Sequence, residues 1–295
     1  MKRYALLISC EEYKEYGDIC YCHSDAVLMQ ETLTEYCDYD REDLELEMLY
    51  LDDENTPEKI YKKLLQFIEK ASSEDTVLFY FAGHGMKIGM QGFLILPNTS
   101  KNDVCNTALE LKKLNEIMLG KKCNCFMILD ACHSGTLSRG EMSDLFIENL
   151  IDKSCVTLAS CSENECSYPD EKREQGVFTY YLAEAIKNTT IGQKIFLDEL
   201  KSQIYENMKE WCLENYKQQT PTLVGTIVGK PSIATRNTKI YEYAPIVPKK
   251  KEVITVEDTK LEVVPMNSEN MVSQVLWQSS SGIELPKVAT LETIL

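Results

Sequence analysis

Two short apolar runs, each ending in a chemically reactive residue, place the strongest constraint on how this chain folds. Residues 76–82 (TVLFYFA) lead into Gly83-His84-Gly85, and residues 125–129 (CFMIL) lead into Asp130-Ala131-Cys132. Continuous apolar runs of this length are typical of buried strands in a parallel sheet. In open α/β sheets, ligands bind just beyond the carboxyl ends of the strands. The two runs therefore predict that a histidine and a cysteine are delivered to one site.

Strand-like and helix-like segments alternate along the first 230 residues. Strands are expected at about 3–9, 44–51, 76–82, 125–130, 156–161 and 222–228, and a short hairpin at 86–97. Helices are expected to begin near Ser24-Asp25 and Thr56-Pro57, and to cover about 107–119, 177–188 and 195–216. Such alternation predicts βαβ units. The fold class is therefore α/β, with a mostly parallel central sheet flanked by helices on both faces.

The composition and the hydrophobic pattern of the sequence change after residue 230. Pro245-Ile246-Val247-Pro248 is followed by three lysines and is linker-like, and the remaining residues show short β-prone patches without helical period. We therefore predict one domain over residues 1–230. Residues 231–295 are a C-terminal tail or small appendage whose role the sequence leaves open.

Charge and cysteine usage exclude several classes of protein. A formal net charge of −16 argues against a nucleic-acid or anionic-membrane partner. The apolar start is too short for a signal peptide and no later run approaches the length of a membrane span. The twelve cysteines contain no C-x-x-C pair and only three histidines accompany them, so no metal site is expected. Free thiols in a reducing, cytoplasmic compartment are the expectation.

Cys132 and His84 suit nucleophilic catalysis. A thiolate is the reactive form of cysteine, and a neighbouring imidazole can accept the thiol proton. His84 lies between two glycines that permit close approach of a substrate, whereas His133 adjoins Cys132 and His23 lies before a helix. The backbone N–H groups of Gly85 and Cys132 are candidates for an oxyanion hole. Spacing alone reveals no third residue that would orient the histidine.

Two other interpretations stay open at this point. Buried cysteines and histidines are often structural, and only the joint placement of Cys132 and His84 at strand ends favours catalysis. Cys132 with Arg139 also suggests the phosphate-binding loop of tyrosine-type phosphatases. That loop would here be one residue too long and would lack its glycines.

At these residues the chain resembles the caspase, metacaspase and paracaspase group of cysteine peptidases. YFAGHG (80–85) resembles the histidine motif of that group, and DACHSG (130–135) resembles its nucleophile motif. Weaker similarity extends over CHSDA (22–26), GVFTY (176–180) and QTP (219–221), so the resemblance covers about residues 3–229. It is closest to the bacterial metacaspase type.

The resemblance implies a caspase-like sandwich and a Cys132–His84 dyad that hydrolyses peptide bonds through a thioester. It further implies that Asp25 and Asp130 line a pocket selecting arginine or lysine, with Cys22 and Ala82 as further substrate-binding positions. Paired carboxylates suit a guanidinium. Metacaspases often have serine at the position of Ala82, which weakens arginine-over-lysine preference more than basic specificity. A helix cap is the alternative role for Asp25.

The sequence says less about how the protein is regulated than about its chemistry. The chemistry requires no cofactor, while calcium stays open as an activator, and a regulatory protein is a further open partner. Arg139, Lys153, Lys172 and Arg173 are candidate sites of autoprocessing, because a peptidase with basic specificity would cut after them. The main alternative function is a caspase-fold binding or scaffold module that no longer cuts.

Overall fold

The computed structural model describes residues 1–52, 54–89, 91–120, 123–131, 155–162, 165–226 and 232–237, and the backbone of 260–264 and 274–278. The chain divides into two compact units, Met1–Tyr241 and Glu242–Leu295. In the smaller unit, β14 (Lys260–Val264) and β15 (Gln274–Gln278) form an antiparallel pair. All other elements belong to the larger unit.

The larger unit is built on a six-stranded sheet with the order β12-β8-β7-β3-β1-β2. Five strands are parallel, and β12 pairs antiparallel with β8 at one edge. The buried strands are near-continuous apolar runs, as expected when both faces of a parallel sheet are covered. The strands are β1 (Arg3–Cys10), β2 (Leu44–Leu49), β3 (Thr76–Ala82), β7 (Asn124–Asp130), β8 (Cys155–Ala159) and β12 (Thr222–Thr226).

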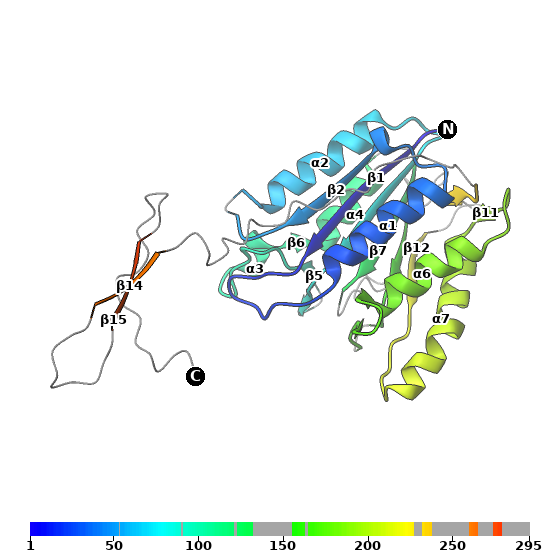
Figure 1. Cartoon of the computed structure of the whole chain (residues 1–295). Helices are drawn as coiled ribbons and strands as arrows, with labels where there is room; N and C mark the ends of the chain where they lie inside the picture. The colour runs from blue at the N-terminus through cyan, green and yellow to red at the C-terminus, as the bar shows by residue number, and fades with distance from the viewer. Residues whose placement is uncertain are drawn as a thin grey trace. The chain divides into compact units, whose positions relative to one another are not determined.

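Helices cover both faces of the sheet (Figure 1). Alternate strand residues point to two separate apolar clusters, one with each helix layer. One layer contains α2 (Pro57–Lys70) and α4 (Leu111–Leu119), and the other contains α1 (Cys22–Tyr36), α6 (Val177–Asn188) and α7 (Leu197–Glu214). Smaller elements are η1 (Arg41–Asp43), α3 (Val104–Thr107), and the three-stranded sheet of β4 (Gly85–Ile88), β5 (Gln91–Leu94) and β6 (Leu109–Glu110). The predicted α/β class, mostly parallel sheet and two helical layers are confirmed.

The strand order reverses between β1 and β3. From β1 the chain moves outward to β2, and it then returns to the other side of β1 to form β3 and β7. The loops that follow β1 and β3 therefore diverge at neighbouring strand ends, which is where open α/β sheets bind ligands. His84 follows β3 at this point.

Two predicted boundaries were wrong. The first helix begins at Cys22 rather than at Ser24-Asp25, and its N-cap is Tyr21, which has a left-handed backbone (φ 74). The helix predicted over 107–119 begins at Leu111, because Leu109 and Glu110 pair instead with β5. Both differences come from tertiary contacts that override local helix signals.

The compact unit continues beyond residue 230, where the sequence predicted a domain boundary. β13 (Ala234–Thr235) pairs with β11 (Lys194–Ile195), and Ile233 and Ala234 are fully buried. The buried Tyr39 hydroxyl donates a 3.0 Å hydrogen bond to the Ile233 carbonyl. These residues close the apolar layer formed with α1, α6 and α7.

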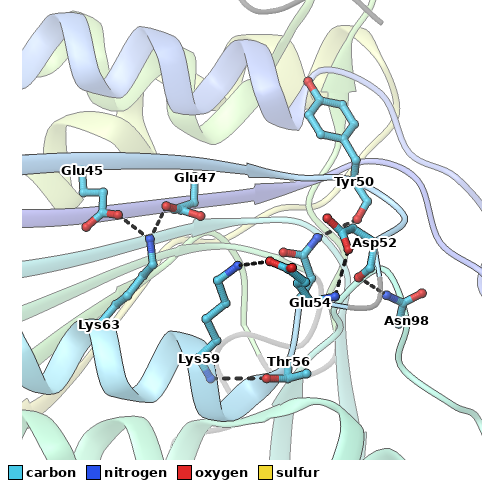
Figure 2. A network of polar contacts seen from close by, with 10 residues as sticks. Glu45, Glu47, Tyr50, Asp52, Glu54, Thr56, Lys59, Lys63 and Asn98 are labelled. Carbon is cyan, nitrogen blue, oxygen red and sulfur yellow. Dashed lines mark hydrogen bonds and ion pairs between the residues drawn. The ribbon is translucent and has the colours of Figure 1, made fainter.

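Charged side chains line the outer strand β2 (Figure 2). Lys63 reaches from α2 to Glu45 and Glu47, with which it forms two ion pairs. Near the start of the helix, the Thr56 hydroxyl accepts a hydrogen bond from the Lys59 N–H at 3.4 Å. Charges on an edge strand oppose pairing with further strands.

Candidate functional site

The register between β3 and β7 aligns the two motifs that the sequence singled out. Ala82 lies opposite Asp130, and the Gly83 N–H donates to the Asp130 carbonyl at 3.2 Å. His84 comes two residues after Ala82, and in the sequence Cys132 comes two residues after Asp130. Cys132 itself, with His133, Arg139 and Lys153, lies outside the described residues, so its catalytic and oxyanion roles stay predictions.

His84 is held by the loop that follows β1. Its Nε2 lies 2.7 Å from the Gly17 carbonyl oxygen, and its ring packs against Tyr13 with centroids 4.7 Å apart. Because a carbonyl only accepts, Nε2 carries the hydrogen and the neutral ring has its lone pair on Nδ1. The sequence did not identify Gly17 or Tyr13, since a backbone carbonyl supplied by a distant loop leaves no motif.

Gly83 makes this approach feasible. A Cβ at this position would lie 2.8 Å from the Phe81 ring and 2.9 Å from the Tyr13 hydroxyl. The same hydroxyl accepts a hydrogen bond from the His84 N–H at 3.0 Å and donates to the Cys10 carbonyl at 3.0 Å. Gly85, the other predicted oxyanion donor, begins β4 opposite Leu94.

His23 serves a different environment. Its Nδ1 lies 2.8 Å from the Ser9 hydroxyl, and its ring packs edge-on against Tyr50. Burial lowers the pKa of this histidine. The preference for His84 over His23 as the candidate base is consistent with these contacts.

A cavity of about 350 Å³ opens beside His84. Its walls come from the loop after β1, the first turn of α1, the ends of β3 and β7, and the hairpin of β9 (Pro169–Asp170) and β10 (Gln175–Gly176). The lining residues are Asp18, Ile19, Cys20, Tyr21, Cys22, Asp25, Gly83, His84, Asp130, Ser167, Tyr168, Pro169, Glu171 and Gly176. These described residues include four acids and no lysine or arginine, so this part of the cavity suits a cation.

Asp25 is buried at this cavity and does not cap its helix. The residue is 2 % exposed, and its Oδ1 accepts a 2.7 Å hydrogen bond from the Gly176 N–H. Burial raises the pKa of this carboxyl well above its usual range, and the charge of Asp130 adds to the rise. The helix-cap alternative is therefore not the role that the structure shows.

Asp130 is also buried, but hydroxyl groups surround it. Ser167 Oγ lies 2.5 Å from Oδ1, and Thr179 Oγ1 lies 2.7 Å from Oδ2. Burial raises the pKa of Asp130, while these two hydroxyl donors oppose the rise. Ser167 and Thr179 were not identified from the sequence, because isolated hydroxyl residues carry no spacing signal.

Gly176 brings the two acids together. An added Cβ would lie 2.6 Å from Asp25 Oδ2 and 2.9 Å from Asp130 Oδ2, so these two oxygens converge on one point. Any side chain there would occupy the space between the carboxylates. The two acids predicted from the family resemblance thus form one buried pair at the cavity.

The other predicted binding positions differ from each other. Cys22 is buried and lines the cavity, and burial beside Asp25 raises the pKa of its thiol well above the ordinary value. Ala82 is buried within β3 and is not among the lining residues.

Lys172 and Arg173 lie in the turn between β9 and β10 and follow Glu171, which lines the cavity. Arg173 is paired with Asp170, and its guanidinium lies 4.6 Å from the Tyr180 ring centroid. Both residues are exposed, but these contacts fix the Arg173 side chain.

The described residues give two further observations. None of their helices is long and apolar enough to cross a membrane. Over the same residues, no cluster of three or more His, Cys, Asp or Glu side chains is arranged to hold a metal ion.

Comparisons with known proteins identify the family. The caspase domain family matches residues 2–230. A protein of Geobacter sulfurreducens has a similar structure, with a TM-score of 0.56 and 15 % identity over 80 % of this chain and 98 % of the other. Caspase-1 from Spodoptera frugiperda is similar with a TM-score of 0.58 and 13 % identity over 81 % of this chain and 92 % of the other. No curated protein sequence matches. With the fold and the family match in agreement, the chain belongs to the caspase-domain family of cysteine peptidases, whose substrates are proteins or peptides.

Proposed function

We propose that this protein is a cysteine endopeptidase that cleaves after arginine or lysine, with Cys132 as nucleophile and His84 as general base and acid. The observation that carries the proposal is the buried Asp25–Asp130 pair in the cavity that His84 borders. Two convergent carboxylates in a cavity whose described lining holds no lysine or arginine favour a cationic side chain of the substrate.

The proposed chemistry follows from the hydrogen bonds of His84. The Gly17 carbonyl binds the protonated Nε2, which leaves Nδ1 to accept the thiol proton of Cys132. The thiolate attacks the scissile carbonyl carbon, and the backbone N–H groups of Gly85 and Cys132 stabilise the resulting oxyanion. The imidazolium then gives its proton to the leaving amine. Water, deprotonated by His84, hydrolyses the thioester and releases the second product and the thiol.

Regulation and location complete the proposal. Cleavage after Arg139, Lys153, Lys172 or Arg173 would process the chain; of these, Lys172 and Arg173 lie among the described residues and are exposed there. Calcium or a regulatory protein would act as activator rather than in the chemistry. We place the protein in the reducing cytoplasm, because its nucleophile must stay a thiol and the chain carries twelve cysteines.

Hydrolysis of matched fluorogenic peptides ending in Arg, Lys or Asp tests this function. The assay compares wild type with Cys132→Ala, and with Cys105→Ala as a matched control at an exposed cysteine of α3. Cleavage after Arg or Lys that disappears only in Cys132→Ala is the expected result, measured with and without calcium. Cleavage only after Asp would contradict the pocket assignment while keeping the nucleophile.

Absence of cleavage of every peptide would favour the binding or scaffold alternative. An arginine chloromethylketone, followed by mass spectrometry, separates a latent enzyme from that alternative. Labelling of Cys132 shows a competent nucleophile beside a basic pocket, and no labelling at any calcium concentration overturns the proposal. The same spectra reveal whether the active chain is intact, which would remove processing as a requirement.

A further inference from the structure

Buried polar side chains form a continuous hydrogen-bond network around Asp130. On one side, the Tyr80 hydroxyl lies 2.7 Å from Thr179 Oγ1, which lies 2.7 Å from Asp130 Oδ2. On the other, Gln219 Nε2 lies 3.0 Å from Ser167 Oγ, which lies 2.5 Å from Asp130 Oδ1. Tyr80, Thr179 and Gln219 are each at most 3 % exposed.

The chemistry of these groups fixes the direction of each hydrogen bond. An amide nitrogen only donates, so Ser167 accepts from Gln219 and gives its own hydrogen to the Asp130 carboxylate. Thr179 likewise gives its hydrogen to Asp130 and accepts from the Tyr80 hydroxyl. Every donor in this hydrogen-bond network is thus directed toward Asp130, an arrangement that favours a charged carboxylate.

Asp25 has a different set of partners. Its Oδ1 accepts from one backbone N–H, and within the described residues its Oδ2 has no hydrogen-bond partner. The two carboxyls are close and buried; burial raises the pKa of both, and the charge of Asp130 raises the pKa of Asp25 further, so the pair favours binding one proton. Because the hydroxyl donors act on Asp130, that proton belongs on Asp25.

Other ionisable groups face the pair from the surrounding elements. They are Glu11 and Asp18 of the loop after β1, Cys22 of α1, Tyr80 of β3, His84 after β3, and Glu171 of the β9–β10 hairpin. They comprise three further acids and no lysine or arginine, so within the part of the chain that the structure describes no lysine or arginine neutralises the pair.

We infer that Thr179, Ser167 and Gln219, with Tyr80 behind Thr179, are positioning residues that keep Asp130 charged and aimed at the substrate's cation, while Asp25 carries the proton of the empty pocket. The inference rests on the proposed basic specificity for its substrate. It assigns the two acids different roles, which a symmetrical pair of pocket carboxylates would not have.

Kinetics of Thr179→Val, which removes the hydroxyl and keeps the volume, tests the inference. For an Arg or Lys peptide, KM is expected to rise about tenfold, with kcat changed by less than about twofold. The KM increase at acid pH is expected to begin at a higher pH than in wild type. Thr179→Ser should restore wild-type values. Thr32→Val is the matched control, because Thr32 is equally buried in α1 and within the described residues its hydroxyl has no partner.

Tyr80→Phe provides a second variant that removes only one hydroxyl group. It should shift KM and its pH dependence in the same direction as Thr179→Val, by a smaller factor. A wild-type KM and pH profile in both variants, or failure of Thr179→Ser to restore the profile, would overturn the inference.

Carbon-13 NMR of the aspartate carboxyl groups gives a readout that needs no hydrolysis. Asp25→Asn and Asp130→Asn assign the two signals in the full-length protein. We expect Asp25 to become protonated at a higher pH than Asp130. Thr179→Val should raise the pH at which Asp130 becomes protonated. If basic peptides are not cleaved and the arginine chloromethylketone does not label Cys132, but this order is found, the proposed function fails and the positioning roles stand. If basic peptides are cleaved but Asp130 becomes protonated at a higher pH than Asp25, only the inference about the positioning residues fails.

Discussion

The Gly176 N–H donates a 2.7 Å hydrogen bond to Asp25 Oδ1, joining two residues that are 151 positions apart in the chain. Gly176 is also the residue whose missing side chain leaves room for both acidic oxygens. Its backbone (φ −65, ψ 135) is one that any residue adopts. The need for glycine therefore comes from the pocket and not from the turn.

Gly176→Ala is expected to impair substrate binding while the protein stays folded. The new Cβ would contact Asp25 Oδ2 and Asp130 Oδ2 at less than van der Waals distance and would push the carboxylates apart. Loss of a charge-assisted contact corresponds to about a tenfold rise in KM for basic peptides. Gly120→Ala, at the end of α4 and away from the cavity lining, is the control. Unchanged KM in Gly176→Ala would contradict the assigned pocket.

Asp25→Asn should stabilise the protein at neutral pH while it weakens binding of basic peptides. The pKa of Asp25 is raised on folding, so the folded state binds its proton more tightly than the unfolded state. Stability is therefore lost as pH rises from about 4, the ordinary aspartate range, through the raised pKa. Asparagine avoids this loss, on the order of 1 kcal/mol or more. Urea unfolding across pH measures it, and the advantage should vanish below about pH 4. An advantage that persists in acid would show another cause.

Tyr13→Phe should reduce turnover without weakening substrate binding. The Tyr13 hydroxyl links the Cys10 carbonyl to the His84 N–H and so holds the histidine beside the Gly17 carbonyl. Without it we expect kcat to fall by about threefold to tenfold at constant KM. Tyr39→Phe, which removes a buried hydroxyl from the opposite helical layer, is the matched control. A change in KM alone would place Tyr13 in binding instead.

Ending the chain at residue 230 should destabilise the larger unit relative to a chain that ends at residue 241. The shorter chain loses buried Ile233 and Ala234, and it loses Arg236, which binds the Lys187 carbonyl at the end of α6. Two buried apolar side chains and their hydrogen bonds correspond to roughly 2–4 kcal/mol. Chemical denaturation of both chains measures the difference. Equal unfolding midpoints would show that residues 232–237 add nothing to the unit.

The sequence by itself determined the elements and the strand ends that deliver reactive residues. Apolar runs such as residues 76–82 form strands because both faces of the sheet are covered, and this signal is local. It also determined the position of His84 after β3 and, through the motif resemblance, the acids Asp25 and Asp130. Local signals failed at Ser24 and at Leu109, where contacts with distant elements set the boundaries.

Tertiary structure decided everything that depends on residues far apart in sequence. The Gly17 carbonyl on His84, the Gly176 N–H on Asp25 and the Thr179 hydroxyl on Asp130 join segments separated by 67, 151 and 49 residues. A carbonyl, an N–H and a single hydroxyl are common to many residues, so their sequence carries no mark of the partner they will meet. Only the tertiary fold brings their partners His84, Asp25 and Asp130 to one cavity, where burial gives the carboxylates their raised pKa and their proposed affinity for a cation.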